Sequence, residues 1–364
     1  MKVRINAILK TLTPLHIAAP GAFRLNTDTG YVEFESAGNK NSMTPCTGIQ
    51  KLRVTGSNGN ISMPVIAANN IAGRLRRHAA ELVLKALRAK GQKVSIQAYS
   101  SLMCGAATGA PDSRDLSYAE YKQSADHPYL GLFGGGPRML SRNVRVMNAL
   151  PVSKETAALM ENLTHPNARS YQQDVNRLTQ AWTFRHNDDL MDLSNVPLQE
   201  ESIENYVEAI QSRQVVIMNE KGNEDENGKK RSKTSTFAFS SLEFVIPGTH
   251  FDLAFNLDVA NEAQIGLFLM SLDSFVSKER MGGHSRNGFG AFVLKDVVMT
   301  DEDGKETNIF DSNGRLNQMA GSVKPYLGAW AIAAANLDTK VIEEMMTMPT
   351  IEKKGKKAAK AEAE

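Results

Sequence analysis

The sequence has few cysteines and no long apolar run. Only two of its 364 residues are cysteine, Cys46 and Cys104, and neither belongs to a C-x-x-C pair. We therefore expect neither a structural zinc site nor a disulfide framework, and a reducing cytoplasm suits such a chain. No stretch of about 18 apolar residues occurs, so no membrane-spanning helix is expected. Residues 1–6 alternate in polarity like a strand and lack the apolar run of a signal peptide.

The chain also has little excess charge, with a formal net charge of +2 at pH 7. Net charge alone therefore does not indicate a nucleic-acid partner, and the local distribution of charge matters more. Basic residues gather at 74–78, at 229–233 and in the final segment, whereas acidic residues gather at 200–201 and 224–226. A nearly neutral protein with such local basic stripes can still follow a phosphate backbone.

No internal repeat is evident, and the hydrophobic pattern predicts a mixed α+β fold. Residues 3–9 alternate like a strand that ends at Thr13-Pro14. A helix is predicted over about 69–90, with Asn69 as N-cap and Gly91 as its stop, and a second helix over 261–279. Further strands are predicted at 31–34, 215–218, 236–245, 251–257 and 291–294. Two strand–helix–strand units of this kind predict a ferredoxin-like sheet.

We expect a single domain followed by a tail. Its parts are a split palm (1–94 and 245–300), a helical insertion (95–210), a β-hairpin thumb (211–244) and a C-terminal segment (301–350). The thumb has apolar arms and a long, highly charged tip at 220–233. Residues 351–364, rich in Lys, Ala and Glu, are expected to be disordered.

The most informative motif is the glycine-rich segment 281–290, which reads MGGHSRNGFG. Its four glycines would let the backbone present successive amides to an anion, and Arg286 would add a charge-assisted contact. A tight helix-to-strand turn is the alternative interpretation, but it explains two glycines more easily than four. The spacing matches neither a P-loop nor a dinucleotide-binding fingerprint.

Two other segments carry glycine and arginine. In 64–77 the start of the long helix would offer free amides and a positive dipole end to a phosphate. An amphipathic helix with solvated arginines is the alternative. The segment 130–138, followed by Arg142 and Arg145, would be only a loop if taken alone.

Together these segments resemble the signatures of the repeat-associated mysterious protein (RAMP) superfamily of CRISPR systems. Residues 64–77 resemble its "proline, small pair, apolar, x, Gly, x, Leu, Arg" motif, 132–134 its "LFG" and 282–290 its late glycine-rich loop. Residues 246–251 resemble the segment that follows the thumb in backbone subunits. The chain looks most similar to the backbone subunit of type IV effectors, a relative of the type III backbone subunit.

This resemblance implies a non-catalytic subunit that coats the guide portion of a CRISPR RNA in antiviral or anti-plasmid defence. Copies would stack head to tail into a helical filament, because heterologous contacts that do not close continue to grow. Contacts would fall mostly on phosphate and sugar. The implied partners are CRISPR RNA, other copies, other effector subunits and a DNA or RNA target paired to the guide. Together with the cysteine usage and the lack of a long apolar run, this leads us to expect a cytoplasmic protein with no cofactor, no metal and no membrane.

The resemblance also implies which residues meet RNA. On the three segments these are Asn69, Asn70, Gly73, Arg74, Arg76, Arg77, Arg138, Arg142, Gly282, Gly283, His284, Ser285, Arg286, Asn287 and Gly288. On the thumb they are Met218, Lys229, Lys230, Arg231, Lys233 and Phe237, of which Met218 or Phe237 would displace a base. Relatives carry a helix lysine where this chain has Ala72, so Arg74 and Arg76 would supply the charge.

Two alternatives remain. One is a ribonuclease of the same superfamily. In type III relatives a loop aspartate after the first strand cuts target RNA, and Asp28 lies in that region, although the surrounding pattern departs from theirs. His16 and His284 could join Asp28 in a general acid–base site, but we favour a binding role for both. The other alternative is an unrelated binding or scaffold protein whose glycine loops are only turns.

Overall fold

The computed structural model describes residues 1–26, 30–34, 43–56, 59–105, 116–153, 165–173, 178–186 and 238–347. The chain forms two compact units. Unit 1 comprises Met1–Pro20, Ile49–Gln180 and Phe244–Glu364, and unit 2 comprises Gly21–Gly48 and Ala181–Glu243. The expected thumb residues from Met218 to Phe237, and Asp28, lie outside the described residues.

Unit 1 is built on a six-stranded sheet with the order β13-β12-β1-β11-β7, in which β8 also pairs with β11. The strands are β1 (Val3–Thr11), β7 (Val144–Val146), β8 (Leu150–Pro151), β11 (His250–Leu257), β12 (Phe292–Thr300) and β13 (Glu306–Asn308). Strand β1 is antiparallel to both β11 and β12. Residues on both of its faces are fully buried: Ile5 belongs to the main core, and Ile8 packs with Val152 and Ala168 in a separate cluster.

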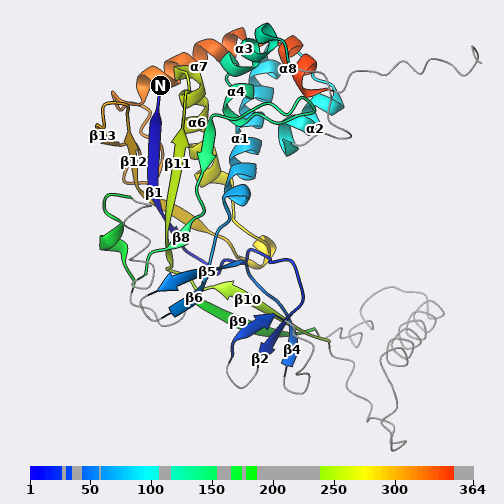
Figure 1. The fold of residues 1–364 in the computed structure, drawn as a ribbon, viewed down its shortest axis with the longest axis vertical. Helices are drawn as coiled ribbons and strands as arrows, with labels where there is room; N and C mark the ends of the chain where they lie inside the picture. The colour runs from blue at the N-terminus through cyan, green and yellow to red at the C-terminus, as the bar shows by residue number, and fades with distance from the viewer. Residues whose placement is uncertain are drawn as a thin grey trace, which may run out of the picture. The chain divides into compact units, whose positions relative to one another are not determined.

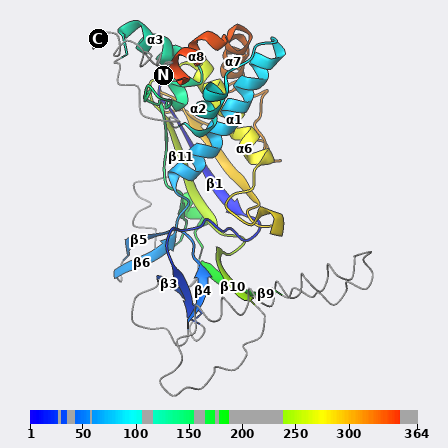
Figure 2. The same cartoon turned by 90° about the vertical axis from the view of Figure 1, so that its right-hand side faces the viewer.

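Two long helices, α1 (Ala68–Ala89) and α6 (Glu262–Lys278), lie on one face of this sheet (Figures 1 and 2). Along the chain the order is β1, α1, β7, β11, α6, β12, and across the sheet it is β12-β1-β11-β7. Neighbouring strands in this path are antiparallel. This is the ferredoxin-like arrangement, so the predicted fold class is confirmed.

Helix α1 buries an apolar stripe that includes Ile71, Leu75, Ala79 and Val83 at helical spacing. Its end agrees with the prediction, since the chain turns at Gly91 with φ +71°. Its start does not. The N-cap is Ala67 and not Asn69, because the side-chain oxygen of Asn148 accepts from the backbone N–H of Ala68 at 2.8 Å. A residue 80 positions away thus takes over the capping role that a local pattern assigned to Asn69.

Helix α6 begins with a capping box formed by Asn261 and Gln264, which explains its sharp start. It is buried over most of its length because α7 (Lys324–Asn336) packs against it. The close approach requires glycine at position 266, where an added Cβ would lie 2.0 Å from the carbonyl oxygen of Tyr326. A short helix, α8 (Thr339–Met346), follows α7.

The interval expected to be a helical insertion contains helices, but it also contains strands. Its helices are α2 (Ile96–Cys104), α3 (Tyr118–Asp126), α4 (Leu130–Phe133) and the 3-10 turn η2 (Ala168–Tyr171). Strands β7 and β8 lie in the same interval and pair with β11. The edge of the palm sheet therefore comes from inside residues 95–210, a contribution that the sequence analysis did not predict. A hairpin of β5 (Lys51–Gly56) and β6 (Gly59–Pro64) precedes α1.

Unit 2 contains a five-stranded sheet with the order β3-β2-β4-β10-β9. Its strands are β2 (Phe23–Asn26), β3 (Val32–Phe34), β4 (Met43–Thr47), β9 (Thr179–His186) and β10 (Ala238–Val245). Strand β10 matches the predicted returning arm of the hairpin, but its partners among the described residues are β9 and, in parallel, β4. The predicted outgoing arm at 215–218 lies outside the described residues. No described helix is both long and apolar enough to cross a membrane.

Candidate nucleic-acid interface

The glycine-rich loop 281–290 joins the end of α6 to β12 and packs against residues 14–16. The N–H of Gly283 donates to the carbonyl oxygen of His16 at 2.8 Å, and that of Gly290 donates to Pro14 at 2.8 Å. These contacts leave no room for side chains at two positions. A Cβ on Gly282 would lie 2.0 Å from the His16 carbonyl oxygen, and one on Gly290 would lie 2.0 Å from that of Met281.

The other two glycines of the loop are different. Gly288 has φ +83°, which favours glycine, but an added Cβ would meet nothing within 4 Å. Gly283 is exposed, and a Cβ there would make only an ordinary contact of 3.5 Å with the His16 ring. The turn interpretation therefore accounts for Gly282, Gly288 and Gly290. It does not account for Gly283, where neither crowding nor a positive φ demands glycine.

The crest of the loop carries its polar side chains outward. His284, Ser285, Arg286 and Asn287 are all exposed, and residues 285–287 form the 3-10 turn η4 (Ser285–Asn287). Phe289, only 3% exposed, anchors the loop from below with its ring 5.7 Å from that of Phe244. The loop thus has a fixed base and a polar crest whose hydroxyl, amide and guanidinium groups can donate to phosphate oxygens.

The structure brings together the two histidines that the sequence analysis singled out. The rings of His16 and His284 lie 5.3 Å apart in an edge-to-face arrangement. His16 is 1% exposed, whereas His284 is exposed on the loop crest. A substrate could reach His284 directly, but His16 lies beneath the surface.

The three arginines near the start of α1, Arg74, Arg76 and Arg77, have different environments. Arg76 donates to the carbonyl oxygens of Cys104 at 3.2 Å and Phe133 at 3.1 Å, so it ties α1 to the ends of α2 and α4. Arg74 forms an ion pair with Glu279 at 2.5 Å. Arg77 is exposed. Arg74 and Arg76, the two arginines expected to replace the missing helix lysine, therefore both have partners within the protein.

The turn between α3 and α4 is stabilised by a side chain. His127 Nδ1 accepts from the backbone N–H groups of Tyr129 and Leu130, at 3.1 and 3.2 Å, and so caps α4. Burial lowers the pKa of His127 to about 4, so the imidazole is neutral and can accept. The side chain of Arg138 is 4% exposed and pairs with Glu120 at 3.4 Å, whereas Arg142 is exposed.

Among the predicted RNA-contact residues, the exposed members are Asn69, Arg77, Arg142, Gly283, His284, Ser285, Arg286, Asn287 and Gly288. Asn70, Gly73, Arg74, Arg76, Arg138 and Gly282 are partly covered. Sequence reasoning missed Glu279, which precedes the loop and holds Arg74. Its position at the end of an amphipathic helix was a sequence signal for a role near the loop. Its partner, Arg74, could not be identified from the sequence because it lies 205 residues away.

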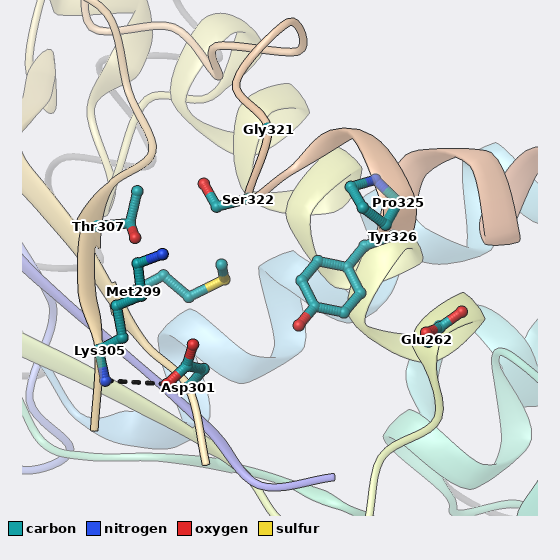
Figure 3. Close-up of a pocket in the computed structure, with 9 residues that line it drawn as sticks. All are labelled: Glu262, Met299, Asp301, Lys305, Thr307, Gly321, Ser322, Pro325 and Tyr326. Atoms are coloured by element: carbon teal, nitrogen blue, oxygen red, sulfur yellow. Dashed lines mark hydrogen bonds between the residues drawn. The ribbon is translucent and has the colours of Figure 1, made fainter. Parts of the chain in front are cut away.

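A separate pocket of about 280 Å³ lies between the β12–β13 turn and the start of α7 (Figure 3). The Tyr326 hydroxyl and the Asp301 carboxylate point into it, with Glu262 at its rim. Burial, together with Asp301 and Glu262, raises the pKa of Tyr326. Carboxylates repel phosphate, so this pocket does not extend the candidate interface. Within the described ranges, no three metal-binding side chains come together.

The fold and the loop define a ferredoxin-like α+β protein that presents a glycine-rich, polar crest. A sequence model of the RAMP superfamily matches residues 8–293. The chain therefore belongs to the RAMP superfamily.

Two solved structures contain similar chains. A chain in "Type IV-B CRISPR Complex" is 16% identical with a TM-score of 0.45, and the match covers 87% of this chain and 99% of that one. A chain in "Cryo-EM structure of the Type III-B Cmr-beta bound to cognate target RNA" is 13% identical with a TM-score of 0.34, covering 82% and 60%. At these scores the family assignment rests on the sequence match. No curated protein matches the chain significantly.

Proposed function

We propose that this chain is a repeated, non-catalytic subunit that binds the guide portion of a CRISPR RNA in a type IV effector complex. The observation that carries the proposal is the glycine-rich loop. It has a base fixed by residues 14–16, a polar crest that is exposed, and an open position at Gly283. Membership in the RAMP superfamily and the sequence motifs at 64–77 and 132–134 support the same function.

The crest suits phosphate better than base edges. Ser285, Arg286 and Asn287 offer hydroxyl, guanidinium and amide donors, and Gly283 leaves space for a backbone oxygen to approach. Such contacts position RNA without reading its sequence. The RNA itself would then select a DNA or RNA target by base pairing, in defence against viruses or plasmids, together with other effector subunits in the cytoplasm. Copies would stack by a heterologous contact into a helical filament.

The test is sedimentation of the purified chain with RNAs of increasing length. We expect complexes that grow with RNA length, and affinity that falls steeply with salt as phosphates release their counterions. A complex with one chain per RNA at every length would contradict the filament. Unchanged affinity between low and high salt would contradict phosphate recognition.

The second candidate is a ribonuclease, which the proximity of His16 and His284 favours. General acid–base catalysis would need both rings to reach the reacting phosphate, and His16 is 1% exposed. We therefore expect no cleavage of RNA by the purified chain, with or without a divalent metal ion. Cleavage that is abolished by His284→Ala, or by Asp28→Ala, would establish this alternative.

A further inference from the structure

The loop 281–290 leaves α6 at a point held by a side chain of α1. Arg74 Nη1 donates to Glu279 Oε2 at 2.5 Å and to the carbonyl oxygen of Arg280 at 3.0 Å. Its Nε donates to the side-chain oxygen of Asn70 at 3.1 Å. The side chains of Arg74 and Glu279 are only 15% and 23% exposed. Arg74 thus contacts both residues that precede the loop.

The same carboxylate contacts a second residue of α1. His78 Nε2 lies 3.4 Å from Glu279 Oε1, and its Nδ1 lies 3.0 Å from the hydroxyl of Ser274. Burial lowers the pKa of His78, while Glu279 opposes the shift; Glu81, Lys278 and Arg77 also face the ring. The His78–Ser274 contact is a hydrogen bond, whereas His78 Nε2 only lies close to Glu279 and makes no hydrogen bond with it. Arg74 therefore makes the hydrogen bond from α1 to Glu279, and His78 packs beside the same carboxylate.

We infer that Arg74 is a positioning residue, which fixes the start of the glycine-rich loop and does not itself contact phosphate. The inference rests on the proposed function and deepens it. A guanidinium that already binds a carboxylate and a carbonyl oxygen has lost much of its capacity to neutralise a phosphate. The Arg74–Glu279 pair instead couples α1 to the direction in which the loop leaves α6. RNA affinity then depends on Arg74 through loop geometry.

The two roles predict different salt dependence. A residue that neutralises one phosphate contributes about one unit to the slope of log affinity against log salt concentration. We expect Arg286→Gln to weaken binding and reduce the slope by about one. We expect Arg74→Gln to weaken binding several-fold with an unchanged slope. A slope reduced by about one in Arg74→Gln would overturn the inference.

Glu279→Gln provides the sharper test, because the two roles predict opposite signs. If Arg74 bound phosphate, loss of the Glu279 charge would release it and binding would tighten. If Arg74 positions the loop, Glu279→Gln weakens binding. Glu81→Gln is the matched control. It removes an exposed carboxylate that also lies near His78, and it should not weaken binding. Thermal melting of each variant reports whether it is folded.

A second measurement does not depend on RNA at all. In the free chain, Arg74→Gln should speed amide hydrogen exchange in residues 281–290 but not in 83–87 of α1. Unchanged exchange in the loop would overturn the inference. If the loop loosens but Arg286→Gln alters neither affinity nor slope, the positioning role holds and the proposed function fails. The two claims can thus fail separately.

Discussion

Two segments of this protein look alike in sequence and differ in the structure. Residues 130–138 and 281–290 both combine several glycines with an arginine. In the first, the glycines serve packing: a Cβ would lie 2.3 Å from Leu140 O at Gly134 and 2.4 Å from Gly105 O at Gly135. In the second, Gly282 and Gly290 are crowded in the same way, but a Cβ would meet nothing within 4 Å at Gly288 and only an ordinary contact of 3.5 Å at Gly283. A glycine-rich motif is therefore evidence for a ligand only where the protein's own packing does not already require the glycines.

The arginines show the same contrast. The Arg138 side chain is 4% exposed and pairs with Glu120, whereas Arg286 is exposed. One guanidinium stabilises a turn, and the other is available to a partner. The comparison predicts that changes in 130–138 alter stability and that changes in 281–290 alter RNA binding.

Gly134→Val should give the largest effect. Its φ of +56° strains a β-branched residue, and the added Cβ meets backbone atoms that cannot move aside. We expect the free energy of unfolding to fall by about 3 kcal/mol or more. Chemical denaturation measures this free energy. A variant as stable as the wild type would contradict the claim that the glycines of 130–138 are needed for packing.

Acid should weaken the packed segment through His127. Its pKa is about 4 in the folded chain, below the ordinary value of 6.5, so the unfolded chain binds the proton more tightly. Stability is therefore full above pH 6.5 and is lost as pH falls toward 4, by about 3 kcal/mol. His127→Asn keeps a capping oxygen and cannot titrate. Denaturation curves of the two proteins at pH 7 and pH 4.5 give the free energy of unfolding at each pH. It should fall less on acidification in the variant than in the wild type, and an equal fall would contradict the prediction.

Gly283→Val should show the reverse behaviour. The position is exposed and makes no close contact, so we expect the unfolding free energy to change by less than about 0.5 kcal/mol. The added side chain should block approach of a phosphate and weaken RNA binding about tenfold, or about 1.4 kcal/mol. Gly288→Val should weaken binding too, at some cost in stability because of its φ of +83°. Wild-type affinity in a folded Gly283→Val protein would refute the assignment of the loop.

Arg286→Ala should have the smallest effect. One exposed phosphate contact contributes on the order of 1 kcal/mol, so we expect affinity to fall about fivefold, equally for RNAs of different sequence. Fluorescence anisotropy with several unrelated RNAs measures this. A loss confined to one RNA sequence would indicate base readout by Arg286.

The elements predicted well are those whose signals are local. Strand β1 and helices α1 and α6 follow from apolar periodicity. The glycine-rich loop was likewise visible because its residues are contiguous. These patterns suffice because the forces that they report act over a few residues.

The edge strand β7 and the roles of the arginines could not be read in this way. Val144–Val146 is a three-residue strand whose identity depends on pairing with β11, more than 100 positions later. Arg74, Arg76 and Arg138 looked equivalent to Arg286 as cations. Their difference comes from partners such as Glu279, Cys104 and Glu120, which folding brings close.

By itself, the sequence determined the α+β class, the long helices and the presence of a glycine-rich loop in a member of the RAMP superfamily. The tertiary structure decided which glycines are needed for packing and which arginines remain available to a ligand. The physical reason is that periodicity, capping and turn formation are short-range. Steric crowding at a missing Cβ and the pairing of a buried charge depend instead on segments that meet only in the folded chain.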